Sequence, residues 1–530
     1  MALSIGTAVV LLGLLLTVRP ALAHARLEQS DPPAGAVLTA APTAIRLSLS
    51  ETISPQFSVI RVQNAAGQAV NLTDLRQPRE DSRVVQISLQ PDLPSGAYTV
   101  YWRAVSAVDG HVSAGGYPFT VQLPGSAPVA GSAAPAGRSS NDANSDRTPP
   151  PPPLRWFWRA VALIGGAGLL GGALFSSLVL GGVPPMVSPR LARPLGLRLA
   201  RGVIGLAGAV LLALAADMLY QVASLIPTDV PGALGHLDVA GTVIATTGYG
   251  TYWALRVAAA AALLTYGAWR LRYPVSTDWS LAVGAAGLLL AGEALSSHEA
   301  AARPFAGLPL GMLGDLAHLL ATAAWTGGLL YFAVILLPVL RATGPAVAEP
   351  LLGRLIPRFA TLALVSVAVL VVSGVANLAV HTLDPLAVVA SDYGRVLLFK
   401  HLLFLPLLAV GALNQRVLRP RFVALVTATS PPPPPTPPLK GEGRRTTTSP
   451  PPPPTPPLKG EGRRTALISP PAAVGQRAGE RGPSTPPSSV EKGAGGLGLL
   501  ARFGRTVGLE AALAVAVLCC AAGLTLLPPP

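Results

Sequence analysis

Short runs of alternating apolar and polar residues mark the first part of the chain. They include Ile45–Leu49, Val84–Leu89 and Tyr98–Val105, with Pro, Gly and Asn residues between them. Alternation with a period of two predicts half-buried β-strands. Several short strands within about a hundred residues are typical of a β-sandwich. We therefore expect residues 24–123 to form an all-β sandwich domain with Greek-key connections.

Long apolar segments replace this alternation from Trp156 onward. We count about eight, each reaching the roughly 20 residues that an α-helix needs to cross a bilayer. They lie near residues 157–180, 202–225, 250–269, 279–297, 312–338, 358–381, 394–414 and 506–527. The chain is 50% hydrophobic and 12% charged, which is the balance of a membrane protein. The pattern predicts an all-α polytopic membrane domain, with all helices but the last within residues 154–426 and the last within 497–530.

Two segments have the composition of linkers. Residues 124–153 are rich in Pro, Ala and Ser and predict a tether between the two domains. Residues 427–496 contain a near-exact duplication, because Ser430–Thr446 recurs as Ser449–Thr465. Two copies are too few for a solenoid, and such a composition cannot bury a core. We expect a disordered cytoplasmic insert, with a proline-rich docking motif as the alternative.

The first residues resemble a secretion signal. An apolar run from Ala2 to Thr17 precedes Ala21-Leu22-Ala23, which has the small-x-small form of a cleavage site. We therefore expect residues 1–23 to be a signal peptide and His24 to be the first residue of the mature chain. Because no Lys or Arg precedes the apolar run, an uncleaved anchor helix is the alternative, and His24 would then lack a free α-amine.

Arginines indicate the orientation of the helices. Clusters beginning at Arg190, Arg270, Arg341 and Arg416 follow alternate apolar segments, and the other loops carry almost no Lys or Arg. The positive-inside rule makes the arginine-rich loops cytoplasmic. The β-domain and the C-terminus are then expected on the periplasmic side of a bacterial inner membrane.

The net charge of +14 does not indicate a nucleic-acid partner. Between Ser430 and Arg505 there are 11 Lys and Arg against 4 Glu, so about half of the excess lies in the insert and its border. The remaining excess marks the cytoplasmic ends of helices. We expect the lipid bilayer, and no nucleic acid, as a partner.

Three residues of the β-domain suggest a metal site. A mature N-terminal His24 would offer its amine and its ring, and Asp109 and His111 are two residues apart, which on a β-strand places both on one face. Nitrogen donors together with a carboxylate suit Cu(II). The cysteines, Cys519 and Cys520, are adjacent within an apolar segment and form no Cys-x-x-Cys motif.

Ionisable residues also fall within the apolar segments. Asp217, Glu293, Arg256, His318 and Lys400 are examples. Such residues are costly in a membrane unless they are paired, and they mark a pathway or site by default. The alternative is a structural set of ion pairs, in which Arg256 and Lys400 neutralise the two acids.

A weak internal repeat relates two parts of the membrane domain. Tyr249-Gly250 is followed by Arg256, and Tyr393-Gly394 is followed by Lys400 at the same interval. We infer two four-helix halves in parallel orientation.

The β-domain resembles the periplasmic copper-binding CopC family. The resemblance rests on His24-Ala-Arg-Leu27, Ser30–Leu38 and Tyr101–His111, although Val108 is inserted relative to the commoner Ala-Asp-Gly-His motif. It implies that His24, Asp109 and His111 hold Cu(II).

The membrane part resembles the copper-resistance protein D (CopD) family. The matching residues are Ser297-His298, His318–Gly328, Arg358-Phe359 and Tyr393-Gly394. His298 and His318 are the positions carried over as candidate copper ligands, with no oxidation state implied.

The resemblance implies copper import, homeostasis or resistance at the inner membrane, without enzymatic activity. The expected partners are the copper ion and periplasmic copper donors or cuproenzymes. Because the sequence has no phosphate-binding Gly-x4-Gly-Lys-Ser/Thr loop, movement would be passive or driven by the membrane potential. The alternatives are copper storage or cuproenzyme assembly without transport, a copper reductase with haem on His318 and His401, and oxidative chemistry at a His24 copper.

Overall fold

The structure is a computed structural model. In it the β-domain consists of two sheets. The structure describes residues 26–108, 110–126, 152–181, 189–275, 278–296, 310–381, 391–429 and 489–527. One sheet has the strand order β1-β3-β5 and the other the order β2-β7-β6-β4. The strands are β1 (Leu27–Asp31), β2 (Val37–Leu38), β3 (Ala44–Leu49), β4 (Val59–Asn64), β5 (Val84–Ser88), β6 (Gly96–Val105) and β7 (Val112–Val121). The three strands predicted from alternation are thus present as β3, β5 and β6.

Alternating residues of the strands fill the space between the sheets. In β3 the side chains of Ile45, Leu47 and Leu49 are buried, while the residues between them are not. The β6 side chain of Trp102 reaches the same core and lies over Gly115 of β7, where an added Cβ would be 2.7 Å from the indole ring. The core therefore determines the pairing of β6 with β7.

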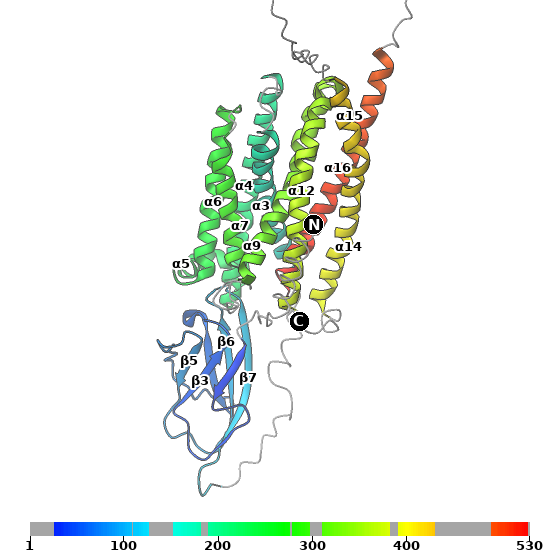
Figure 1. The fold of residues 1–530 in the computed structure, drawn as a ribbon. Coiled ribbons are helices and arrows are strands. Elements are labelled where there is room, and N and C mark those ends of the chain that lie inside the picture. The colour runs from blue at the N-terminus through cyan, green and yellow to red at the C-terminus, as the bar shows by residue number, and fades with distance from the viewer. Residues whose placement is uncertain are drawn as a thin grey trace, which may run out of the picture.

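The first group of helices begins at Pro153. It comprises α3 (Pro153–Leu174) with its π-helical extension η2 (Phe175–Leu180), α4 (Pro189–Leu225), α6 (Gly248–Arg272) and α7 (Ser280–Leu295). Each helix packs on the next, and α7 packs back on α3. The short α5 (Leu237–Thr246) lies across the end of this group that faces the β-domain (Figure 1).

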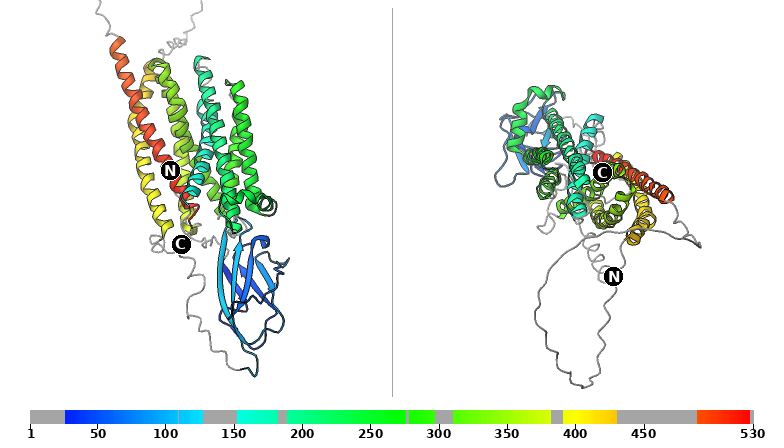
Figure 2. Two further views of the ribbon diagram at one scale, coloured as in Figure 1. Left: turned by 180° about the vertical axis from the view of Figure 1, so that it is seen from behind. Right: turned by 90° about the horizontal axis from the view of Figure 1, so that it is seen from above.

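The second group repeats this order of contacts. Its first helix runs through α9 (Leu310–Thr322), η4 (Ala323–Gly327), α10 (Gly328–Leu330), η5 (Tyr331–Leu336) and α11 (Leu337–Thr343). It is followed by α12 (Pro345–His381), by α14 (Asp392–Leu413) with η6 (Asn414–Leu418) and α15 (Arg419–Thr429), and by α16 (Ser489–Leu524). Successive helices pack together, and α16 returns to η4, α10 and η5. The contacts support the predicted division into two four-helix halves, which lie side by side in Figure 2.

Matching helix starts give the repeat a local basis. At the start of α6 the Thr247 hydroxyl accepts a hydrogen bond from the Gly250 amide at 3.0 Å. At the start of α14 the Ser391 hydroxyl accepts one from the Gly394 amide at the same distance. Such side-chain caps satisfy amides that the first turn leaves without helical partners. The two Tyr-Gly motifs therefore begin equivalent helices.

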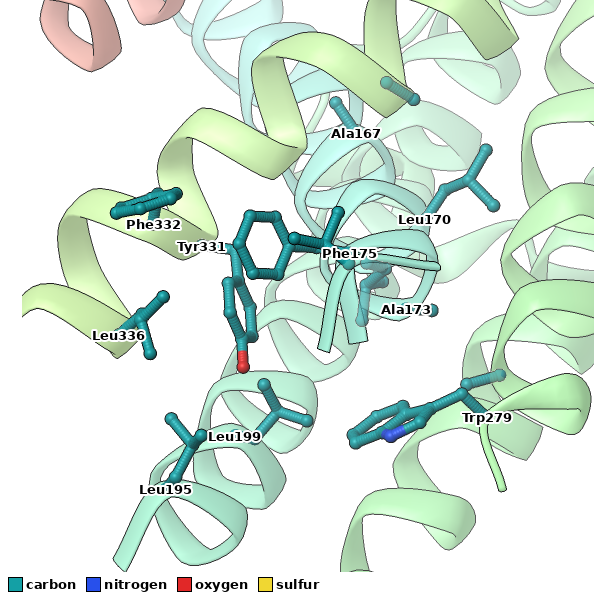
Figure 3. Packing of buried hydrophobic residues seen from close by; sticks show 14 of the residues in the cluster. Ala167, Leu170, Ala173, Phe175, Leu195, Leu199, Trp279, Tyr331, Phe332 and Leu336 are labelled. Atoms are coloured by element: carbon teal, nitrogen blue, oxygen red, sulfur yellow. The ribbon is translucent and has the colours of Figure 1, made fainter. Parts of the chain in front are cut away.

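The two halves meet at closely packed glycines. An added Cβ on Gly327 of η4 would lie 1.9 Å from the Ala167 carbonyl oxygen of α3, and one on Gly171 would lie 2.3 Å from the Ala323 oxygen. One turn further along, the Phe175 ring packs against the Tyr331 ring with centroids 4.6 Å apart (Figure 3). Small residues that permit close backbone approach are typical of helix contacts in membranes.

Among the described residues, six helices are long and apolar enough to cross a membrane by length and composition. They begin at Pro153, Leu191, Gly311, Pro345, Asp392 and Gly498. The predicted segments near 250–269 and 279–297 correspond to α6 and α7, which pack beside these six. The count of eight stays a prediction. Two helices also extend into the segment predicted as a disordered insert, because α15 ends at Thr429 and α16 begins at Ser489.

Candidate functional site

His111 lies in the loop between β6 and β7 and not on a strand, which corrects the sequence-based placement. The Ser106 amide donates to the His111 oxygen at 2.9 Å and closes the loop. Inside it, Gly110 has a φ of +73°, a conformation that breaks an extended strand and favours glycine. His24 and Asp109 lie outside the described residues, so their positions relative to His111 stay predictions.

A buried carboxylate stands at the base of this loop. Glu51 is 5% exposed, and its Oε2 accepts a hydrogen bond from the Ser106 hydroxyl at 2.9 Å. The adjacent Thr52 oxygen accepts from the Ala107 amide at 3.0 Å. Glu51 therefore places an acid at the base of the loop that bears His111, and no sequence pattern pointed to it.

The same loop contacts the membrane helices. Gln221, near the end of α4, is 5% exposed, and its Nε2 donates to the Gly110 oxygen at 2.7 Å. The Gly248 amide, at the start of α6, donates to the Ala107 oxygen at 2.8 Å. The β-domain thus rests on the ends of α4 and α6 through the loop that bears His111, as the approach of β6 and β7 to the helices in Figure 1 illustrates.

Further contacts surround these two hydrogen bonds. The Arg103 guanidinium of β6 donates to the Ser224 oxygen of α4, and burial lowers the pKa of Arg103. An apolar cluster joins Val105 to Met218 and Val222 of α4. Polar and apolar contacts therefore occur together where the β-domain meets α4 and α6.

A small cavity lies beyond Tyr249, which follows Gly248 in α6. The Tyr249 hydroxyl donates to Asp217 Oδ2 at 2.8 Å. Asp217 lines the cavity together with Arg155, Arg159 and Arg256. A bare metal cation would meet three guanidinium groups here, so the cavity is electrostatically unsuited to a cation site.

The carboxylate of Glu293 on α7 forms ion pairs with two of these arginines. Its Oε2 is 2.5 Å from Arg256 Nη2, and its Oε1 forms an ion pair with Arg159. Arg159 also donates from Nε to the Thr525 hydroxyl at 3.1 Å. The network therefore links α3, α6 and α7 to the end of α16. Arg256 is paired with an acid, as the structural alternative in the sequence analysis expected.

His318 occupies the second half of the helices. On α9, its Nδ1 is 2.9 Å from the Ser373 hydroxyl of α12, and that hydroxyl donates to the Val369 oxygen at 2.7 Å. Because the serine proton is directed at Val369, the serine oxygen is left to accept from a protonated Nδ1. We assign His318 the tautomer in which Nε2 carries no proton, which is the form that ligates metals.

The remaining candidates do not join His318 in a described cluster. His298 lies outside the described residues. His401 is exposed on α14, and its Nδ1 is 2.8 Å from the Leu397 oxygen of its own helix. Within the described ranges no group of three His, Cys, Asp or Glu residues could hold a metal ion.

Arg155, Arg159 and Gln221 were missed by the sequence analysis. A signal existed for the first two, since arginines four residues apart at the start of an apolar helix share one face. No comparable signal existed for Gln221, because its partner Gly110 is 111 residues away in the chain.

The fold and site define a multi-pass membrane protein whose N-terminal β-domain rests on a helical domain. Sequence models of three families match it: the CopC domain over residues 27–122, the N-terminal domain of copper resistance protein D-like proteins over 152–308, and copper resistance protein D over 353–439. The chain belongs to the fused CopC/CopD copper transport and resistance family.

Several individual proteins are similar to parts of this chain. The copper transport protein CutJ of Bacillus subtilis is 26% identical over 415 residues, which cover 77% of this chain and 70% of that protein. Copper resistance protein C of Escherichia coli is 33% identical over 108 residues, or 19% of this chain and 84% of that protein. Copper resistance protein D of Pseudomonas syringae pv. tomato is 31% identical over 194 residues, or 36% of this chain and 59% of that protein. The crystal structure of CopC from Methylosinus trichosporium OB3b covers 20% of this chain and 100% of that one, with 27% identity and a TM-score of 0.19.

Proposed function

We propose that this protein captures Cu(II) on its N-terminal domain outside the inner membrane and transfers copper into or across the membrane. One observation carries the proposal: the loop that bears His111 is also the loop that rests on α4 and α6. Copper held by this loop is therefore held at the surface of the membrane domain. The relative named as a copper transport protein is similar over 77% of this chain, a stretch that extends beyond either domain alone.

His24, Asp109 and His111 are the proposed Cu(II) ligands. Two imidazoles and a carboxylate, with the α-amine if the chain is cleaved before His24, form the mixed nitrogen and oxygen set that Cu(II) prefers. The Glu51 carboxyl group, which accepts from the Ser106 hydroxyl, lies at the base of the same loop.

His318, with His298, is the proposed copper site of the membrane part. A free Nε2 on His318 makes it competent as a ligand, and the Ser373 hydroxyl fixes the orientation of its ring. The membrane potential would favour inward movement of a cation. The proposed role is binding and transfer, without catalysis.

Cu(II) binding to the purified full chain tests the capture step. We expect the electron paramagnetic resonance spectrum to show nitrogen ligands, and tight binding to be lost in His111→Ala. It should be kept in His318→Ala and in the control His236→Ala, whose side chain is exposed on the loop before α5. Unchanged Cu(II) binding in His111→Ala would contradict the proposed ligand set.

Copper storage or delivery to a cuproenzyme is the second candidate. It is favoured by the position of the capture loop, which rests on the first half of the helices, whereas His318 belongs to the second half. The two candidates differ in whether copper enters a sealed vesicle.

A further inference from the structure

We propose that Gln221 is a positioning residue for copper capture, and that copper on the β-domain and docking of that domain on α4 and α6 stabilise each other. The inference rests on the proposed function, since it concerns the loop that would hold Cu(II). It adds that the membrane helices form part of the capture machinery without contacting the metal.

The contact between Gln221 and the loop is close and buried. The Gln221 side chain is 5% exposed and donates to the carbonyl oxygen of Gly110, the residue between Asp109 and His111. An added Cβ on Gly110 would lie 2.7 Å from Gln221 Nε2. The side chain therefore fits a glycine at this position and fixes the peptide bond between Gly110 and His111.

A second hydrogen bond holds the other side of the loop. The Gly248 amide of α6 donates to the Ala107 oxygen at 2.8 Å. Because α4 holds the Gly110 oxygen and α6 holds the Ala107 oxygen, these two loop residues lose conformational freedom before copper arrives. Such pre-organisation raises affinity, because the ordering cost is met in advance.

Thermodynamic linkage makes this effect reciprocal. If docking raises the affinity for copper by some factor, copper raises the stability of docking by the same factor. Copper leaving the loop would therefore loosen the β-domain from the helices.

The experiment measures Cu(II) affinity in the full chain for the wild type and for Gln221→Met, which keeps most of the side-chain volume and removes the donor. We expect affinity to fall about tenfold, the ratio that 1.4 kcal/mol represents. A buried hydrogen bond that loses one partner costs about that much. The matched control Gln415→Met, in η6 at the other end of the helices, should bind copper like the wild type.

Hydrogen exchange at the Gly248 amide reports docking directly, since this amide donates to Ala107. Cu(II) should slow its exchange in the wild type, and Gln221→Met should speed it. Arg103→Gln removes a separate docking contact, the one with Ser224. It should likewise lower the affinity for Cu(II) and speed exchange at the Gly248 amide. This second variant keeps the test informative if Gln221→Met does not fold.

Two outcomes would overturn the proposal. One is unchanged copper affinity in variants whose Gly248 amide exchanges faster, and the other is exchange at Gly248 that does not respond to Cu(II). Failure of the proposed function has a different signature, namely Cu(II) binding that survives His111→Ala.

Discussion

Arg256 on α6 forms an ion pair with the carboxylate of Glu293 on α7, with Nη2 2.5 Å from Oε2. The two residues are 3% and 6% exposed, so the ion pair is enclosed by the first half of the helices. A buried pair is costly to break, because removing one partner leaves the other charge without compensation.

Loss of the Glu293 charge should therefore destabilise the protein strongly. We expect Glu293→Gln to lower the free energy of unfolding by about 3–5 kcal/mol, measured by thermal unfolding of the protein in detergent. Asp392→Asn is the control, since Asp392 forms an ion pair with Arg395 in which both side chains are more than two thirds exposed. A surface pair of this kind contributes little. Equal stabilities of the two variants would contradict a buried role for Glu293.

A methyl group on Gly327 should separate the two halves. The added Cβ would lie 1.9 Å from the Ala167 oxygen, and overpacking of this kind costs about 1–3 kcal/mol or more. Gly284→Ala on α7 is the matched control, because nothing lies within 4 Å of its added Cβ. The yield of monodisperse protein and its thermal stability measure the effect. A Gly327→Ala protein as stable as the control would mean that the helices do not cross here.

The two helix caps should contribute equally to the free energy of unfolding. Thr247→Ala and Ser391→Ala each remove the hydroxyl that accepts from an amide of the first helical turn. We expect each to lower the free energy of unfolding by about 1 kcal/mol, whereas Thr251→Ala, one turn into α6, should have little effect. Thermal unfolding again provides the measurement. A cost at one cap and none at the other would argue against equivalent halves.

The β-domain should lose stability at high pH through Tyr117. Burial raises the pKa of Tyr117 to about 12, whereas an unfolded tyrosine has a pKa of about 10. The stability that depends on its neutral form is fully present below pH of about 10 and is lost as the pH rises through about 12. Tyr117→Phe should therefore resist alkaline unfolding better than the wild type. Circular dichroism of the β-domain measures this.

The control for this prediction is Tyr101→Phe, whose side chain is 49% exposed. Its alkaline transition should coincide with that of the wild type. An unchanged transition in Tyr117→Phe would show that another group limits alkaline stability.

Local patterns explain which parts of the fold could be predicted. β3, β5 and β6 follow from alternation, and the repeat of Tyr249-Gly250 as Tyr393-Gly394 follows from two short motifs that begin helices. The position of His111 could not be predicted, because a spacing of two residues does not reveal that Gly110 has a positive φ.

Contacts between distant parts of the chain could not be predicted from the sequence. The pairing of Gln221 with Gly110 joins a membrane helix to a loop of the other domain. The pairing of Arg159 with Glu293 joins two helices of one bundle. Each depends on packing of elements far apart in the chain, which no local pattern encodes.

Copper uptake into sealed vesicles that carry the β-domain on the outside tests the central claim most directly. We expect the intact protein and His236→Ala to move copper into the lumen, and His24→Ala and His318→Ala to move almost none. His318→Ala should still hold Cu(II) on its β-domain. Copper that binds outside vesicles of the intact protein and never reaches the lumen would contradict transport and identify a copper-holding and delivery protein.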